Sequence, residues 1–191
     1  MKKIVNYCLY VLAASYCTAP LHGQTVTETI DELLKAYSAQ GEFNGCALVA
    51  KNGTVMLNKG YGFRNLLAKT PHDAHSIFQI SSLTQEFTTA IILQMQEKKL
   101  LSVRDPIAAY LPGFPHGNEI SIEDLLTHTS GIFNYTDNPE FIKSGWVKPI
   151  RTDSLAVFFR GRPLEFQPGT SYRYSNSGYV LLGYIIEKIS G

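Results

Sequence analysis

The dipeptide Asn52-Gly53 separates two mostly apolar runs, residues 46–50 and 54–61. Asn-Gly between such runs is the strongest short signal for a two-residue β-hairpin turn, because both turn positions must adopt positive φ angles. We therefore predict two antiparallel strands joined by a tight turn. Since a two-stranded hairpin is only marginally stable in water, other elements of the chain must cover it.

The remainder of the chain favours helices. Residues 27–39 carry apolar side chains at helical spacing and stop before Gly41, which predicts one amphipathic helix ahead of the hairpin. Beyond the hairpin, a long helix is predicted over residues 82–99 and an apolar helix over residues 178–189, with Gly191 as its C-cap. Shorter helical or loop segments are expected at residues 105–110, 122–127 and 152–159. The predicted order, a helix, a hairpin and then helices only, is that of an α+β fold.

The composition is that of a packed globular domain. Of the 191 residues, 45% are hydrophobic and 17% are charged, which excludes a disordered or fibrous chain. Lys and Arg together number 17 against 16 for Asp and Glu, so no basic surplus exists to neutralise a nucleic-acid backbone. We therefore expect no nucleic-acid partner.

The N-terminal segment differs from the rest of the chain. Lys2 and Lys3 precede a mostly apolar stretch over residues 4–19, which is the pattern of a cleaved export signal. A membrane anchor is the alternative, but the stretch is shorter than the ~18 to 20 residues that a bilayer span requires and is interrupted by polar residues. We therefore predict a signal peptide at residues 1–23, a domain over residues 24–191, a periplasmic or secreted location, and no stable membrane span.

The cysteines and histidines give little support for thiol or metal chemistry. Cys8 and Cys17 fall within the predicted signal peptide, so Cys46 would stand alone and cannot form an internal disulfide. Its small, apolar sequence neighbours favour an inert buried thiol over a nucleophile. His72 and His75 suggest zinc, but no third ligand cluster accompanies them, and a polar loop explains them. No metal or cofactor is expected.

Three short segments carry the chemical signal. Ser82 begins the predicted long helix, where a serine by itself is interpreted as an N-cap. Two further segments follow: Leu-Leu-Thr-His-Thr-Ser-Gly at residues 125–131 and Tyr-Ser-Asn at residues 174–176. Together the three segments resemble motifs of the serine beta-lactamase-related family, which includes class C beta-lactamases, D-alanyl-D-alanine carboxypeptidases and related esterases. The resemblance extends from about residue 27 to residue 191.

The resemblance implies roles for four residues. The family's Ser-x-x-Lys motif falls on Ser82 to Gln85, and its Tyr-x-Asn motif falls on Tyr174 to Asn176. In the family the serine is acylated by a carbonyl substrate, while the lysine and the tyrosine handle its proton. Asn176 is implied to bind substrate, with a turn residue as the alternative role. The implied fold is the N-terminal part of a beta-lactamase/transpeptidase-like fold.

The family's third motif, a strand of Lys-Thr-Gly or His-x-Gly type, is expected after Tyr-x-Asn and is not found there. Lys143-Ser144-Gly145 spells a similar triplet, but it precedes Tyr174 and is interpreted as a solvated turn. We therefore expect residues 24–191 to form an incomplete domain from which the C-terminal strands are absent. Loss of one oxyanion donor with that strand lowers the rate of acyl transfer by ~10²- to 10³-fold in known cases.

Gln85 stands where the family has lysine. A glutamine amide takes up no proton at ordinary pH. A tyrosine hydroxyl, with an ordinary pKa near ~10, needs a nearby cation to act as a base at neutral pH. His128 is a candidate general base, but the resemblance implies that its segment is a helix end and turn that shapes the cleft.

Two hypotheses about function therefore remain. The first is an exported serine hydrolase that transfers the acyl group of a beta-lactam, a peptidoglycan peptide or an ester through Ser82. The second is a catalytically inactive relative, with Gln85 in place of the lysine, that binds a cell-wall peptide or a protein partner in the same cleft.

Overall fold

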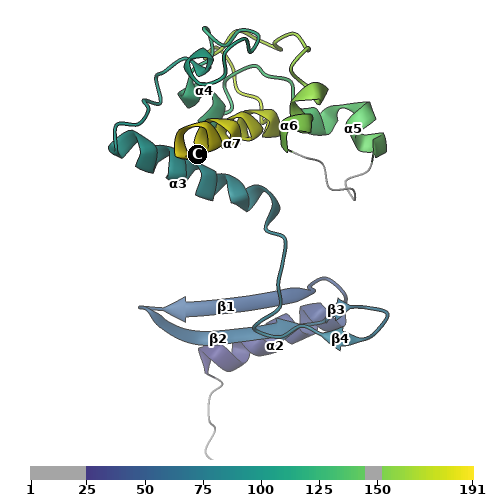
Figure 1. Cartoon of the computed structure of the whole chain (residues 1–191). Helices are drawn as coiled ribbons and strands as arrows, with labels where there is room; N and C mark the ends of the chain where they lie inside the picture. Colours follow the sequence, from purple (N-terminus) through teal and green to yellow (C-terminus); the bar gives the residue numbers. More distant parts are fainter. Residues whose placement is uncertain (1–24, 145–151) are drawn as a thin grey trace, which may run out of the picture. The chain divides into compact units, whose positions relative to one another are not determined.

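The computed structural model describes residues 25–144 and 152–191 and divides into two compact units, Met1–Gln79 and Ile80–Gly191 (Figure 1). The signal peptide predicted at residues 1–23 lies outside the described residues, as does Gly145 of the Lys-Ser-Gly triplet. Within the described ranges, no helix combines the length and the apolar character that a membrane span requires.

The first unit is built around the hairpin. Its described elements are α2 (Val26–Ala39), β1 (Gly45–Lys51), β2 (Thr54–Tyr61), β3 (Phe63–Asn65) and β4 (Thr70–Pro71). β1 and β2 pair in antiparallel register, and Asn52 and Gly53 have φ angles of 49° and 77°, so the predicted hairpin and its turn are confirmed. The antiparallel pair β3 and β4 was not predicted, because strands of three and two residues carry no alternating apolar pattern.

The helix α2 lies against β2 and covers the hairpin (Figure 1). Asp31 on α2 accepts hydrogen bonds from the Tyr61 hydroxyl at 2.8 Å and from Lys59 Nζ at 3.0 Å. Lys35, Tyr61 and Lys59 hold the pKa of Asp31 well below its usual range, and burial raises the pKa of Tyr61 to about 12. The predicted amphipathic helix is thereby confirmed, and it supplies the cover that an isolated hairpin lacks.

The second unit is helical in its described residues. Its elements are η1 (Ser81–Leu83), α3 (Thr84–Glu97), η2 (Ile107–Ala109), α4 (Ile122–Leu126), η3 (Tyr135–Asp137), α5 (Pro139–Ser144), α6 (Thr152–Leu155), η4 (Ala156–Phe158) and α7 (Asn176–Ser190). The segments predicted at residues 105–110, 122–127 and 152–159 each contain one or two of these short helices.

The two long helices of this unit begin elsewhere than predicted. Ser82 lies in the 3₁₀ turn η1, which continues directly into α3 at Thr84 because Leu83 and Thr84 both have right-handed helical backbone angles. Neither η1 nor α3 has a side-chain N-cap, so the N-cap interpretation of Ser82 was wrong. At the other end of the unit, α7 begins at Asn176, two residues before its predicted start.

The core of the second unit lies where α7 packs against α3 and α4 (Figure 1). Its most buried side chains are at most 2% exposed: Ile92, Ile107, Ile120, Ile122, Leu125, Phe159, Leu181, Leu182 and Ile185. Burying each such side chain stabilises the fold by about 1.5–3 kcal/mol. This packing brings α7 alongside α3 and α4.

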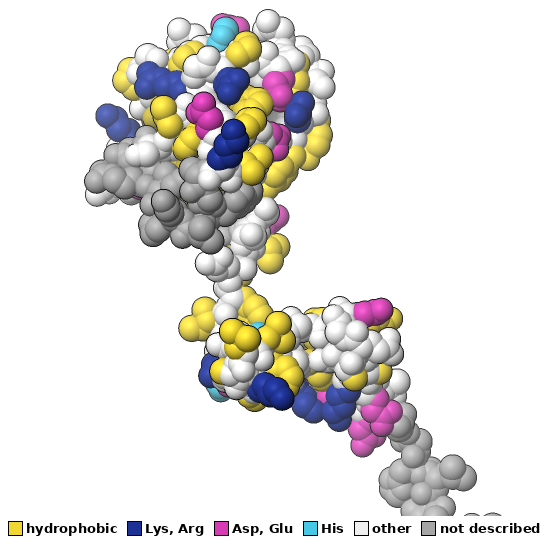
Figure 2. Space-filling view, turned by 90° about the vertical axis from the view of Figure 1, so that its right-hand side faces the viewer, with side chains coloured by type: hydrophobic (Ala, Val, Ile, Leu, Met, Phe, Trp, Pro, Cys, Tyr) yellow, Lys and Arg dark blue, Asp and Glu magenta, His cyan; other side chains and the backbone are white. Residues whose placement is uncertain are grey.

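Apolar side chains also remain exposed in both units (Figure 2). In the first unit they include Leu48 and Val55 on the hairpin and Leu67 between β3 and β4. In the second unit Leu83 and Phe87 are each more than 60% exposed at the start of α3.

Candidate active site

A cleft of about 520 Å³ opens in the second unit where η1, α3, η3 and α7 meet. The described residues that line it are Ser81, Ser82, Thr84, Gln85, Thr88, Tyr135, Thr136, Tyr174, Asn176, Tyr179 and Val180. None of these is Lys, Arg, His, Asp or Glu. The lining is therefore rich in hydroxyl and amide groups and holds no ionic side chain of these five types.

Ser82 presents its side chain to this cleft from the turn η1. Its Oγ accepts a hydrogen bond from the Tyr174 hydroxyl at 3.0 Å. Gln85 follows three residues later, in the first turn of α3, so its side chain points to the same side of the chain as Ser82. The structure thus brings together Ser82, Gln85 and Tyr174, as the resemblance implied.

The Gln85 amide is the centre of the hydrogen-bond network. Its Nε2 donates to the Tyr174 hydroxyl oxygen at 2.8 Å and to Asn176 Oδ1 at 3.2 Å. The Tyr174 hydroxyl has one proton and two acceptors within 3.0 Å, namely Ser82 Oγ and Asn176 Oδ1. In this arrangement the Tyr174 hydroxyl donates a hydrogen bond to Ser82 Oγ and accepts one from the neutral amide of Gln85. No group in the network is set to remove the proton of Ser82.

Asn176 is held by contacts on its other side. As the first residue of α7, its backbone N–H has no partner within the helix and donates instead to Asn134 Oδ1 at 3.0 Å. Its side-chain Nδ2 lies 3.4 Å from both Asn134 Oδ1 and Thr136 Oγ1. The turn-residue alternative for Asn176 was wrong, since the residue begins a helix.

The buried Ser177 ties the start of α7 to the segment that carries Asn134. Its Oγ donates to the Phe133 carbonyl oxygen at 2.7 Å and accepts from the Tyr135 backbone N–H at 2.9 Å. Sequence reasoning missed Asn134, Thr136 and Ser177. A polar run after the apolar Ile-Phe pair at residues 132–133 was the available signal, but its partners lie about 40 residues further along the chain.

His128 supports Tyr174 without touching Ser82. It adopts a φ of 60° in the turn after α4, and its carbonyl accepts the Arg173 backbone N–H at 3.0 Å. Its Nδ1 accepts the Ser175 N–H at 3.3 Å, and its ring centroid lies 4.6 Å from that of Tyr174. Burial lowers the pKa of His128, which favours the neutral ring. Because Nδ1 is an acceptor, the neutral ring carries its proton on Nε2.

The other candidates from the sequence are not among the described residues that line this cleft. Cys46 is only partly buried, and its thiol donates to the Asp73 carbonyl at 2.9 Å within the first unit. The His72 ring stacks on Phe78 with centroids 5.1 Å apart. In the described part of the chain, no three His, Cys, Asp or Glu residues are grouped as metal ligands. Lys143 lies in the last turn of α5, where a solvated turn had been predicted.

Comparison with known proteins agrees with the arrangement of the cleft. A family model described as Beta-lactamase matches residues 30–191. The chain belongs to the beta-lactamase family. Among the family's proteins, penicillin-binding protein 4* of Bacillus subtilis is 33% identical over 174 residues, which cover 89% of this chain and 36% of that protein.

Solved structures of the beta-lactamase family confirm the predicted fold. A penicillin-binding protein from Bacillus halodurans matches 88% of this chain and 50% of its own, at 30% identity and a TM-score of 0.73. A D-stereospecific amidohydrolase from Streptomyces matches 60% of this chain and 37% of its own, at 31% identity and a TM-score of 0.54. The chain spans less than half the length of the curated relatives it matches, so it corresponds to part of the family's fold.

Proposed function

We propose that this protein is a member of the beta-lactamase family that binds an amide or ester carbonyl beside Ser82 without transferring its acyl group at the rates of active relatives. One observation carries the proposal: the Gln85 amide fills the lysine position and donates to both Tyr174 and Asn176. The absence of any charged residue from the described cleft lining supports it.

The chemistry of acyl transfer explains why Gln85 would slow the reaction of Ser82 with a substrate. As the Ser82 oxygen bonds to the substrate carbonyl carbon, its proton must pass to a base. A positioned base accelerates such a step typically by ~10²- to 10⁴-fold. Gln85 has no basic nitrogen, and as a neutral donor it supplies no positive charge to draw the proton from Tyr174. His128 Nδ1 is occupied by the Ser175 N–H.

Binding itself needs no base. The Asn176 amide and the hydroxyl groups around it offer donors and acceptors for a substrate amide, and Ser82 stays exposed at the cleft surface. By analogy with the relatives, whose names include penicillin-binding proteins and an amidohydrolase, we propose beta-lactams, peptidoglycan peptides and D-amino acid amides or esters as the classes to test. The N-terminal segment supports the proposal that the protein is exported and meets such ligands outside the cytoplasm.

A second candidate function, slow acyl transfer through Ser82, is favoured by one contact. Tyr174 lies 3.0 Å from Ser82 Oγ, within reach for proton transfer. The two functions differ in whether a covalent bond to Ser82 forms.

The test combines labelling with binding. Wild-type protein and the matched control Ser82→Ala are incubated with a fluorescent penicillin and examined on a denaturing gel and by intact-protein mass spectrometry. Their melting temperatures are then measured at increasing benzylpenicillin concentration. We expect equal, background labelling and, in both proteins, a melting temperature that rises with ligand. Rapid stoichiometric labelling of the wild type alone would favour acyl transfer, and the absence of both labelling and stabilisation would overturn the binding function.

A further inference from the structure

A second pocket, of about 280 Å³, lies on a different face of α7 from the candidate active site. Its described lining residues are Tyr110, Leu111, Pro112, Phe114, Ala156, Arg160, Leu181, Tyr184 and Lys188. Leu181, Tyr184 and Lys188 are spaced three and four residues apart, so they share one side of the helix. Asn176, Tyr179 and Val180 of the active-site cleft lie about a third of a turn away at 100° per residue.

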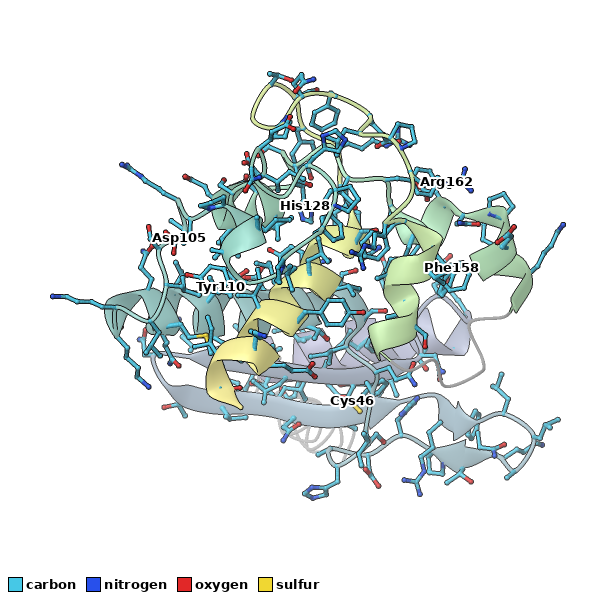
Figure 3. The ribbon with its side chains drawn as sticks, turned by 45° about the horizontal axis from the view of Figure 1, so that its top comes forward. Cys46, Asp105, Tyr110, His128, Phe158 and Arg162 are labelled. Atoms are coloured by element: carbon cyan, nitrogen blue, oxygen red, sulfur yellow. The ribbon has the colours of Figure 1, made fainter. Side chains whose placement is uncertain are left out.

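The floor and walls of this pocket are apolar. Leu181 is 1% exposed, and Phe114 and Leu111 belong to the apolar side chains packed against the core. Tyr110 lies beside α7 and points its hydroxyl at Asp105, which accepts the proton at 2.6 Å (Figure 3). Burial and this hydrogen bond raise the pKa of Tyr110 to about 12. Its hydroxyl therefore stays neutral and hydrogen-bonded to Asp105, and its ring contributes an apolar surface to the pocket.

The two charged residues of the lining are both cations. Arg160 donates from Nη2 to the Gly113 carbonyl at 2.8 Å, and its guanidinium carbon lies 6.0 Å from the centroid of the Phe114 ring. These contacts hold the guanidinium at the pocket and use one of its five N–H donors. The Lys188 side chain, in the last turn of α7, makes no hydrogen bond or ion pair within the described residues. No Asp or Glu lines the pocket.

We propose that this pocket binds a small organic carboxylate with an apolar group the size of one aromatic ring. The apolar floor provides the hydrophobic contact, and the fork of Arg160 matches a planar carboxylate. Lys188 adds a second positive charge, so the pocket discriminates against neutral and cationic analogues of the same shape. Its volume is just below the ~300 to 1,000 Å³ of typical ligand pockets, which limits the ligand to a single ring with a short linker.

The proposal is tested with 3-phenylpropanoate as the probe and 3-phenylpropanamide as its neutral counterpart. Binding of both to the full chain is measured by titration in nuclear magnetic resonance spectra. We expect the carboxylate to bind about tenfold more tightly than the amide, because only the carboxylate forms charge-assisted hydrogen bonds with the two cations, and these are stronger than hydrogen bonds to a neutral amide. Arg160→Gln and Lys188→Gln are each expected to weaken carboxylate binding several-fold and to leave amide binding unchanged.

Arg162→Gln is the matched control. Arg162 is also an exposed arginine over an aromatic ring, with its guanidinium carbon 5.4 Å from the centroid of Phe133, but it does not line the pocket. This variant should bind the carboxylate like the wild type, as should Ser82→Ala, which alters only the other cleft. Equal binding of carboxylate and amide, no saturable binding, or an Arg162→Gln loss equal to that of Arg160→Gln would each overturn the proposal.

Discussion

Ser177→Ala should destabilise the protein far more than an ordinary serine substitution does. The Ser177 side chain is fully buried and joins the start of α7 to the segment of η3 by two hydrogen bonds, to the Phe133 carbonyl and from the Tyr135 N–H. Removing the hydroxyl leaves both backbone groups without a partner. Each unpaired buried polar group costs about 1–3 kcal/mol, and because Phe133 and Tyr135 are only half-buried, we expect a total of about 2–4 kcal/mol.

The assay is equilibrium unfolding in urea, with Ser190→Ala as the matched control. Ser190 ends the same helix but is exposed, so both substitutions change helix propensity alike and their difference reports the buried hydrogen bonds. In thermal unfolding, about 2–4 kcal/mol corresponds to a fall in melting temperature of about 4–16 °C for a chain of this size. A difference between the two variants below about 0.5 kcal/mol would refute the assignment of Ser177 as the link between these segments.

Two further predictions concern the segments around the cleft. Because burial lowers the pKa of His128 from 6.5, the unfolded chain binds a proton at this residue more readily than the folded chain does. The stability that His128 contributes is therefore complete above about pH 6.5 and decreases as the pH falls below it. Between pH 7.5 and 5 the urea midpoint should fall less in His128→Gln than in the wild type, and equal declines would contradict this. Gly131→Ala should lower the free energy of unfolding, measured in urea, by about 2–5 kcal/mol, because the residue has a φ of 71° and an added Cβ would overlap the Phe166 carbonyl oxygen. Gly161→Ala, with open space around the Cβ, is its control and should change stability by less than about 0.5 kcal/mol; similar losses in both would contradict the steric argument.

Local sequence signals predicted the elements that depend on neighbouring residues. The Asn52-Gly53 turn needs only two residues able to adopt positive φ, and the apolar repeat of α7 is visible within fifteen residues. The α-helical part of α3 starts two residues later than predicted because the residues before it form a 3₁₀ turn, which composition does not distinguish from the first turn of an α-helix. Strands as short as β3 and β4 carry no pattern that distinguishes them from a loop.

The candidate site was only partly predictable for a different reason. Resemblance to a family predicted that Ser82 shares one cleft with Tyr174 and Asn176, although these two residues follow it by about 90 positions in the chain. The supporting contacts of Asn134 and Ser177 depend on how α7 packs, which no local pattern encodes. Which groups donate and which accept hydrogen bonds around Gln85 likewise depends on the folded structure.

The central claim of the proposed function is that Gln85, which stands in place of the family's lysine, leaves the Ser82–Tyr174 pair without the cation that proton transfer requires. Gln85→Lys retains a similar length and helix propensity and places an amine where the Gln85 amide now contacts Tyr174 and Asn176. The rate of acylation by a fluorescent penicillin is measured for the wild type, for Gln85→Lys, and for Gln85→Lys combined with Tyr174→Phe. The three proteins are identical at every other position, so the ratios of their acylation rates report only on residues 85 and 174.

We expect Gln85→Lys to be acylated about 10²- to 10⁴-fold faster than the wild type, which is the usual effect of a positioned base. The added Tyr174→Phe substitution should abolish that gain, because the lysine and the tyrosine act as one unit. An inert but folded Gln85→Lys protein, or a gain that persists without the Tyr174 hydroxyl, would contradict the account.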